Sequence, residues 1–433
     1  MPVALITVLG LVLRLLSALV QPVALDEAYA VFETRFYHFP FTSTSPPLFP
    51  LLFRIWTHIS VNLFWIRLPS VIAGTLTIII VWLLMRTVDR KTADISAFLA
   101  AVSPILVHYS WFARIYGVEI LCIALSLLLF LQAIRGKHVV LLTAVNIVGC
   151  FISYGFILYL PAVFFSILVW RFSTIKRLIL PFVLPAAAIA GLLIYALQHA
   201  AAIQAANSWI PPFSLPNFAG MLAVLTNMSG VVTGTPIPLP YALLFLAGMI
   251  GYIVLTVRIS PKSLSFFRFL LPVGFVLILI ASATTPSGIP RTFLFFHLFF
   301  LLSFSSILVS LIKKSRFLSI TLLTLYLAAI IPVYRAINIR PYYNNPSTLI
   351  AIAKAGIRPV YTIVTPKSNL PIVAYEWNLK NITLLHDTTD RPPQKFTLFH
   401  IATTRLSAGA HQLMANKNCN VEHAPGIVIY YCQ

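Results

Sequence analysis

The chain has 433 residues, of which 59% are hydrophobic and only 9% are charged, and its mean hydropathy is +0.93. A soluble domain carries about 25% charged residues, so this composition excludes an ordinary soluble protein. Apolar runs long enough to cross a bilayer, about 17–25 residues each, recur from the N-terminus to about Tyr334. We therefore expect an integral membrane protein with many spans.

The formal net charge of +20 might suggest nucleic-acid binding, but the distribution of the charge argues against it. Basic residues fall in short clusters, and every second loop between apolar runs is basic. This is the cytoplasmic-loop bias of a multi-pass membrane protein. The clusters are Arg86/Arg90/Lys91, Arg135/Lys137, Arg171/Lys176/Arg177, Arg258/Lys262/Arg268 and Lys313/Lys314/Arg316.

The first apolar run, residues 2–20, is predicted to be a retained span and not a cleaved signal peptide. No basic region precedes it, Arg14 lies inside it, and no cleavage site with small residues comes before Asp26.

Apolar runs and charge alternation together predict an all-α polytopic fold of about eleven transmembrane helices, with the N-terminus in the cytoplasm and the C-terminus outside. The stretch 139–170 could be one long helix, but Ser153-Tyr154-Gly155 can form a turn and the charge alternation requires two spans. The expected spans are 2–20, 68–86, 92–108, 115–134, 139–152, 155–170, 178–200, 241–257, 269–285, 291–312 and 317–335.

Three outer loops follow from this topology. The loop 21–67 holds Asp26, Glu27 and the pair Pro46-Pro47, and its segment Leu48 to Ile59 is predicted to be an amphipathic interfacial helix. The loop 201–240 is rich in proline, and the third, from Pro286 to Arg291, is short.

Ordinary polarity returns after about Arg340, so we predict a membrane domain at 1–340 and a small extracytoplasmic α/β domain at 341–433. Cys419 and Cys432 both lie in the second domain, and a disulfide between them is one of two open alternatives. Predicted helices are Ser347–Ala355 and Pro371–Leu379; predicted strands are Val360–Val364, Ile382–Leu385, Thr397–Ile401 and Ile427–Tyr431.

The acidic pair Asp26 and Glu27 is the main catalytic candidate, because the chain has only ten acidic residues and these two follow the first span directly. Carboxylates near a bilayer are costly and usually have a function. The pair could act as general base or hold a metal ion such as Mg²⁺ or Mn²⁺. The structural alternative is that Asp26 caps the helix that follows, and the spacing favours neither reading.

Two arginines, Arg114 and Arg291, are predicted on the same outer side, against the positive-inside bias. The planar guanidinium group suits a phosphate, because it donates two parallel hydrogen bonds. The alternatives for Arg114 are an anchor on lipid headgroups and an ion pair with Glu119, which follows it by five residues. Glu119 could orient Arg114 or join the site itself.

Other catalytic motifs are missing from the sequence. The ten histidines show no metal-ligand spacing, and there is no phosphate-binding glycine loop, no Gly-x-Ser-x-Gly elbow and no Cys-x-x-Cys pair. ATP-driven transport and chemistry on soluble nucleotide sugars therefore have no support.

Several short motifs, in order, give the chain a family resemblance. They are Leu25-Asp26-Glu27-Ala28-Tyr29, Ser45-Pro46-Pro47-Leu48-Phe49, Arg67-Leu68-Pro69-Ser70, Tyr109-Ser110, Ala113-Arg114-Ile115-Tyr116 and Pro290-Arg291. Their order and placement resemble the GT-C glycosyltransferases of the RgtA/B/C/D-like kind, relatives of the mannosyl- and aminoarabinosyltransferases. The resemblance covers essentially the whole chain and is strongest over 20–135.

The resemblance implies a transferase that takes a sugar from a polyprenyl-phosphate donor. Asp26 would be the catalytic base or metal partner, with Glu27 as its neighbour, and Arg114 and Arg291 would hold the donor phosphate. Pro46, Pro47, Tyr116 and Glu119 belong to the expected substrate-binding set. The partners would be the lipid-linked sugar, a lipid, glycan or protein acceptor, and membrane lipids, with no nucleic acid.

The chain departs from the family pattern at two positions. Ser45 stands where many members have His, and Phe112 stands where many have Glu, which puts the metal and the acceptor type in doubt. Two other classes of function remain: a transporter or flippase of lipid-linked sugars, and a non-catalytic envelope scaffold. A transporter usually has its charged site near the bilayer midplane, whereas these charges cluster at one face.

Overall fold

The computed structural model describes most of the membrane region and the strands of the C-terminal region. The described residues are 2–21, 23–36, 46–171, 178–198, 212–229, 236–259, 266–284, 289–339, 361–365, 383–385, 396–401, 419–424 and 427–432.

The chain divides into two compact units, and each is described separately. Unit 1 comprises Met1–Val20, Pro40–Leu52 and Phe64–Arg340, and unit 2 comprises Gln21–Phe39, Phe53–Leu63 and Pro341–Gln433. The division into 1–340 and 341–433 stays a prediction, since two N-terminal segments group with the C-terminal region.

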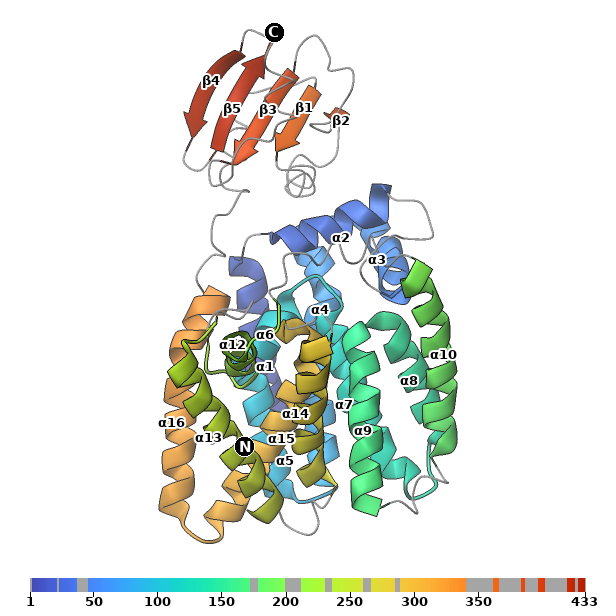
Figure 1. The fold of residues 1–433 in the computed structure, drawn as a ribbon, viewed down its shortest axis with the longest axis vertical. Coiled ribbons are helices and arrows are strands. Elements are labelled where there is room, and N and C mark those ends of the chain that lie inside the picture. The colour runs from blue at the N-terminus through green and yellow to red at the C-terminus, as the bar shows by residue number, and fades with distance from the viewer. Residues whose placement is uncertain are drawn as a thin grey trace. The chain divides into compact units, whose positions relative to one another are not determined.

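Unit 1 is a bundle of apolar helices (Figure 1), and each expected span coincides with helix in the described residues. Among the described residues, seven helices are long and apolar enough to cross a membrane, or eight with one bent pair, and other apolar helices are shorter. The predicted number of eleven spans is therefore not confirmed. The helices are α1 (Val3–Val20), α4 (Leu63–Arg86), α5 (Arg90–Val102), α6 (Pro104–Trp111), α7 (Tyr116–Ala133), α8 (Val139–Ile152), α9 (Tyr154–Arg171), α10 (Ile179–Gln198), α12 (Leu215–Leu225), α13 (Leu239–Ile259), α14 (Phe267–Thr284), α15 (Leu294–Ile312) and α16 (Arg316–Tyr334).

The stretch 139–170 forms two helices and not one. Ser153 ends α8 with extended backbone angles (φ −147°, ψ 138°), and α9 begins at the next residue. Buried polar contacts join this hairpin to its neighbours: Ser126 on α7 donates to Asn146 on α8 (2.7 Å) and accepts from Tyr159 on α9 (3.0 Å). In lipid such hydrogen bonds hold helices together where the hydrophobic effect between them is weak.

The expected span 92–108 coincides with a bent pair of helices. It consists of α5 and α6, bent by 57° at Ser103. The physical reason is Pro104, which has no N–H to donate to the carbonyl of Ala100, four residues earlier. The side chain of Ser103 caps the new helix by accepting from the Leu106 amide (3.3 Å).

The backbone groups released by the bend find partners on distant elements. Arg14, on α1, donates to the carbonyls of Ala100 (3.2 Å) and Ala101 (3.3 Å). Asn227, just after α12, accepts from the amide of Ile105 (3.4 Å). An unsatisfied backbone group costs several kcal/mol in a membrane interior, so these contacts make the bend stable.

Two elements of unit 1 were not predicted. Helix α12 lies inside the proline-rich loop, where the Ser214 side chain caps it by accepting from the Asn217 amide (3.2 Å). A π-helical turn, η4 (Arg335–Ile339), continues α16, and its Asn338 donates to the Pro104 carbonyl (3.1 Å).

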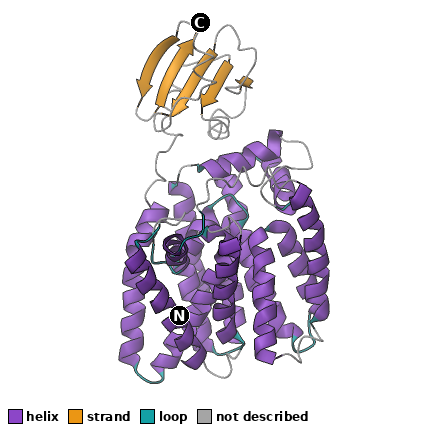
Figure 2. Cartoon of the chain, viewed as in Figure 1, coloured by secondary structure: helices purple, strands orange, loops and turns teal. Residues whose placement is uncertain are grey.

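Unit 2 contains α2 (Leu25–Phe36) and a five-stranded sheet in the order β2-β1-β3-β5-β4, labelled in Figure 1. Figure 2 shows these strands in orange. Pairs β1–β2 and β1–β3 are parallel, whereas β3–β5 and β4–β5 are antiparallel. Four strands lie at the predicted residues, β4 was not predicted, and the predicted helices 347–355 and 371–379 lie outside the described residues. The bounds are β1 (Tyr361–Thr365), β2 (Thr383–Leu385), β3 (Phe396–Ile401), β4 (Cys419–Ala424) and β5 (Ile427–Cys432).

The cysteines divide between the two units. Cys419 is disulfide-bonded and stands opposite Cys432 in the β4–β5 register. Cys122 and Cys150, in α7 and α8, are free thiols.

Replacing Asn227 with Leu should destabilise the bundle by at least about 2 kcal/mol. Asn227 is fully buried, has a left-handed backbone (φ 60°), and donates to the Tyr326 hydroxyl (2.7 Å) besides accepting from Ile105. Each buried group left unpaired costs about 1–3 kcal/mol. The measurement is thermal unfolding in detergent. Asn217→Leu is the matched control, because among the described residues the Asn217 side chain makes a single, exposed hydrogen bond, to the Pro212 carbonyl. Equal losses of stability in the two variants would contradict the account.

Candidate functional site

Asp26 and Glu27 lie in the first turn of α2, in unit 2. Asp26 is half-buried, whereas Glu27 is 0% exposed. The two neighbouring carboxylates therefore have different environments, and Asp26 is the one that is partly exposed.

Glu27 has a structural contact that explains its burial. Its Oε2 atom accepts a hydrogen bond from the backbone amide of Ala24 (2.9 Å), the residue just before the helix. This is the return half of a capping box, in which a Glu at the third helical position binds the amide of the capping residue. Capping therefore involves Glu27, and Asp26 occupies the second helical position. The negative charge of Asp26 at a helix N-terminus is stabilised by the helix dipole.

Pro46 and Pro47 lie immediately before α3 (Leu48–Ile59), which coincides with the predicted interfacial helix. Pro46 is buried and Pro47 is half-buried. The carbonyl of Pro47 accepts from the Leu51 amide (3.3 Å), so this pair fixes the start of the helix. Ser45 lies outside the described residues.

Residues 108–119, here named the α6–α7 corner, form a buried aromatic cluster. Phe112 stacks on His108 (centroids 5.6 Å apart) and on Tyr116 (6.2 Å). Tyr116, 8% exposed, also meets Tyr109 edge to face (4.9 Å). Phe112 is thus a packing residue of this cluster.

The start of α4 is tied to the α6–α7 corner, so two of the quoted motifs meet in space. The guanidinium of Arg67 lies 4.7 Å from the Trp111 ring centroid and donates to the Ala18 carbonyl at the end of α1 (2.7 Å). Ser70 donates to the carbonyl of Arg114 (3.2 Å). Gly117 allows α4 and α7 to pack closely, because any side chain there would come within 3.0 Å of the Ser70 carbonyl oxygen.

Arg114 has a fixed backbone and an available side chain. Its amide donates to the Phe112 carbonyl (2.7 Å), and its side chain is half-buried. Within the described part of the chain, its guanidinium makes no hydrogen bond or ion pair, so the alternative of an ion pair with Glu119 has no support. A rigid backbone with an unpaired guanidinium suits the binding of an external anion.

Glu119 is 1% exposed, and its Oε2 atom accepts from the Ser153 hydroxyl (2.6 Å). Its other oxygen lies against Gly155, where an added methyl group would overlap Oε1 and come within 2.8 Å of the Thr292 carbonyl. Thr292 and Arg291 belong to the 3₁₀ turn η3 (Pro290–Phe293). Unit 1 thus brings Glu119 to the turn that carries the half-buried Arg291.

A metal ion in this site would rest on Asp26. The described residues contain no group of three or more His, Cys, Asp or Glu side chains around a common point. Mg²⁺ is often held by one or two carboxylates, with substrate phosphates and water as the other ligands. The single carboxylate of Asp26 fits that mode, whereas a cage made of protein side chains does not fit the described residues.

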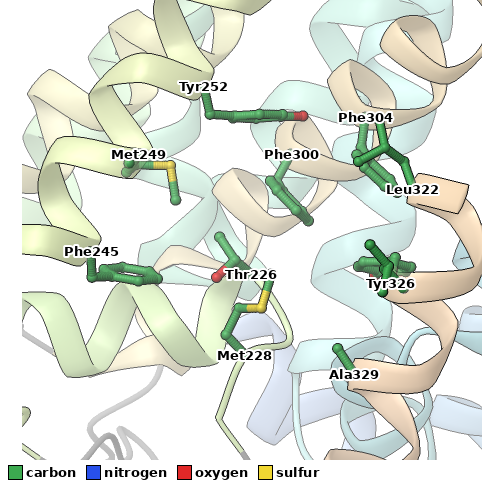
Figure 3. A pocket seen from close by; sticks show the side chains of 12 residues that line it. Thr226, Met228, Phe245, Met249, Tyr252, Phe300, Phe304, Leu322, Tyr326 and Ala329 are labelled. Atoms are coloured by element: carbon green, nitrogen blue, oxygen red, sulfur yellow. The ribbon is translucent and has the colours of Figure 1, made fainter. Parts of the chain in front are cut away.

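Unit 1 also contains an apolar pocket of about 480 Å³ between α13, α15 and α16. Figure 3 shows Phe245, Met249 and Tyr252 on α13 projecting toward Tyr326 on α16, with Phe300 between them. None of the predicted site residues lines it. Its apolar lining suits hydrocarbon.

Several functional contacts were not foreseen from the sequence. Arg14 and Ser153 are both buried, and they bind the Ala100 carbonyl and the Glu119 carboxylate, respectively. An arginine inside an apolar run was the available signal for Arg14. No sequence signal distinguished Asn227 or Asn338.

Part of the chain matches a known protein family. Residues 44–199 match the family model of dolichyl-phosphate-mannose-protein mannosyltransferases. This segment includes Pro46, Pro47, Arg114, Tyr116 and Glu119. The comparison with curated protein sequences gave no match.

The fold is similar to that of a solved structure at low sequence identity. The apo oligosaccharyltransferase of Archaeoglobus fulgidus matches with a TM-score of 0.52 and 15% identity, over 88% of this chain and 64% of that chain. The oligosaccharyltransferase AglB of Archaeoglobus fulgidus, in complex with an inhibitory peptide and a dolichol-phosphate, matches with a TM-score of 0.47 and 14% identity. The match covers 85% of this chain and 63% of that chain. The chain thus spans somewhat less than two thirds of the length of these proteins. The predicted family resemblance is confirmed over residues 44–199 by the mannosyltransferase family match, and the oligosaccharyltransferase structure shows a similar fold.

Glu27→Ala should loosen the start of α2, because it removes the hydrogen bond to the Ala24 amide; loss of a helix cap costs about 1 kcal/mol. Glu27→Gln should keep that bond, since its amide oxygen can accept in the same way. Amide hydrogen exchange of residues 25–36, followed by mass spectrometry, measures the difference. Equally fast exchange in the two variants would show that the charge of Glu27, and not its cap, holds the helix.

Proposed function

We propose that this chain is an integral-membrane glycosyltransferase that moves a sugar from a polyprenyl-phosphate donor to an envelope glycan, lipid or protein acceptor on the outer face. One observation carries the proposal: the mannosyltransferase family match covers residues 44–199, which contain the α6–α7 corner with its available guanidinium. The oligosaccharyltransferase fold supports it.

Asp26 acts in this proposal as the general base. It takes the proton of the acceptor hydroxyl while the hydroxyl oxygen attacks C1 of the sugar. The bond between C1 and the phosphate oxygen breaks, its electron pair leaves with the polyprenyl phosphate, and C1 is inverted. The half-buried carboxylate of Asp26, at the start of a helix, is suited to accept that proton.

Arg114 and Arg291 hold the donor phosphate and stabilise the negative charge that grows on it as the bond breaks. Fixed cationic donors of this kind lower the barrier because they need no reorganisation during the reaction. Tyr116, Pro46 and Pro47 are proposed to shape the substrate site. Glu27 supports Asp26 through the cap on α2.

Asp26 is also the residue that would hold Mg²⁺ or Mn²⁺. A divalent cation bound there would supply a positive charge for the departing phosphate. The chemistry of Arg114 and Arg291 on the same phosphate does not depend on it.

The orientation is proposed with the N-terminus in the cytoplasm and the C-terminal region outside, in a cell membrane. The basic clusters between alternate spans support this. The disulfide-bonded Cys419 supports it as well, because disulfides persist in oxidising compartments.

Asp26→Asn should abolish sugar transfer by membranes while expression stays near the wild-type level, since the amide cannot accept the proton. The assay follows transfer of a radiolabelled sugar from the lipid-linked donor. Asp94→Asn is the matched control: Asp94 accepts from the Trp82 indole (2.9 Å), and an amide oxygen can do the same. Transfer that survives in Asp26→Asn would remove Asp26 from the mechanism.

Mass analysis of lipid-linked sugars in cells with and without the gene separates transfer from the two other classes of function. A transferase predicts that the donor accumulates, on the outer leaflet, when the gene is deleted. A donor trapped on the inner leaflet would indicate a flippase, and an unchanged donor pool would indicate a scaffold.

A further inference from the structure

Glu119 is a buried acid that the proposed reaction does not use. It is 1% exposed, and only one of its carboxyl oxygens, Oε2, has a hydrogen-bond partner among the described residues, the Ser153 hydroxyl (2.6 Å). Leaving a charged oxygen unpaired at such a buried position costs several kcal/mol. The state of the second oxygen therefore needs an explanation.

The surroundings of Oε1 provide one. Gly155 has no side chain at this position: a methyl group there would overlap Glu119 Oε1 and come within 2.8 Å of the carbonyl oxygen of Thr292. Two acceptor oxygens that face the same small space repel each other unless one of them carries a hydrogen. A backbone carbonyl cannot carry it, so the hydrogen belongs to the carboxyl group.

We infer that Glu119 is a neutral carboxylic acid that donates its Oε1 proton to the Thr292 carbonyl and thereby positions Arg291. This inference rests on the proposed role of Arg291 in donor binding. Arg291 is the residue next to Thr292 in η3, so a bond at Thr292 holds the turn that carries the guanidinium. Glu119 is thus a positioning residue and neither a metal ligand nor an ionic partner of Arg114.

The neutral state has a functional consequence. An ionised carboxylate beside the Arg291 turn would compete with the donor phosphate for the arginines. A protonated acid makes the same structural link between α7, α9 and η3 without that competition. Gly155 is required because any side chain there would displace the acid from the carbonyl.

The test measures kcat and KM for the polyprenyl-phosphate-sugar donor with the purified full chain. Glu119→Gln should stay within about threefold of wild type, because its amide can accept from Ser153 and donate to Thr292. Glu119→Ala and Gly155→Ala should raise the donor KM by about tenfold or more, with kcat changed less. Gly251→Ala is the control for the glycine variant, since a methyl group at Gly251 meets nothing within 4 Å.

A second readout does not depend on catalysis. Infrared difference spectra of wild type against Glu119→Gln should contain the carbonyl stretch of a protonated carboxylic acid. Its absence would overturn the inference, as would a Glu119→Gln enzyme as impaired as Glu119→Ala. If the wild-type chain transfers no sugar, the proposed function fails, and the infrared band still decides the state of Glu119.

Discussion

The bend at Pro104 is the constraint on which the rest of unit 1 depends. Proline removes the amide that would bind the Ala100 carbonyl, and a membrane offers no water to replace it. Arg14 supplies the donor at 3.2 Å from α1, while Asn227 and Asn338 satisfy the other side of the bend. These three contacts join elements that are far apart in sequence, so the bend can form only when the bundle is assembled.

The bend sets the direction of α6 and therefore the position of the α6–α7 corner. Helix α6 ends at Trp111, where Arg67 stacks, and the chain then turns through the aromatic cluster to Arg114. The packed rings and the bond from Ser70 hold the Arg114 backbone, while its guanidinium keeps its donors for a ligand. On the other side, Glu119 and Gly155 reach the turn that carries Arg291. The same packing that stabilises the bundle thus presents both arginines of the proposed site.

The sequence predicted where helices and strands lie better than it predicted how they are joined. Apolar length located every helix that was expected to span, and alternation located four of five strands. The sequence alone could not show that Pro104 bends a span. Three other prolines lie inside helices that stay single: Pro69 in α4, Pro161 in α9 and Pro272 in α14. Which proline bends a helix depends on partners such as Arg14 and Asn227. The rarity of acids made Asp26 and Glu119 candidates, but the Glu27 cap and the approach of Gly155 to Glu119 depend on the fold and cannot be predicted from spacing.

The most direct test of the account uses the purified chain in proteoliposomes with a synthetic polyprenyl-phosphate sugar and an acceptor extract from the cell envelope. Mass spectrometry follows the release of free polyprenyl phosphate and the gain of one sugar on the acceptor. The account predicts that both products appear together, in equal amounts, and only with the wild-type protein and not with an Asp26 variant. A donor that crosses the bilayer unchanged, without either product, would contradict it.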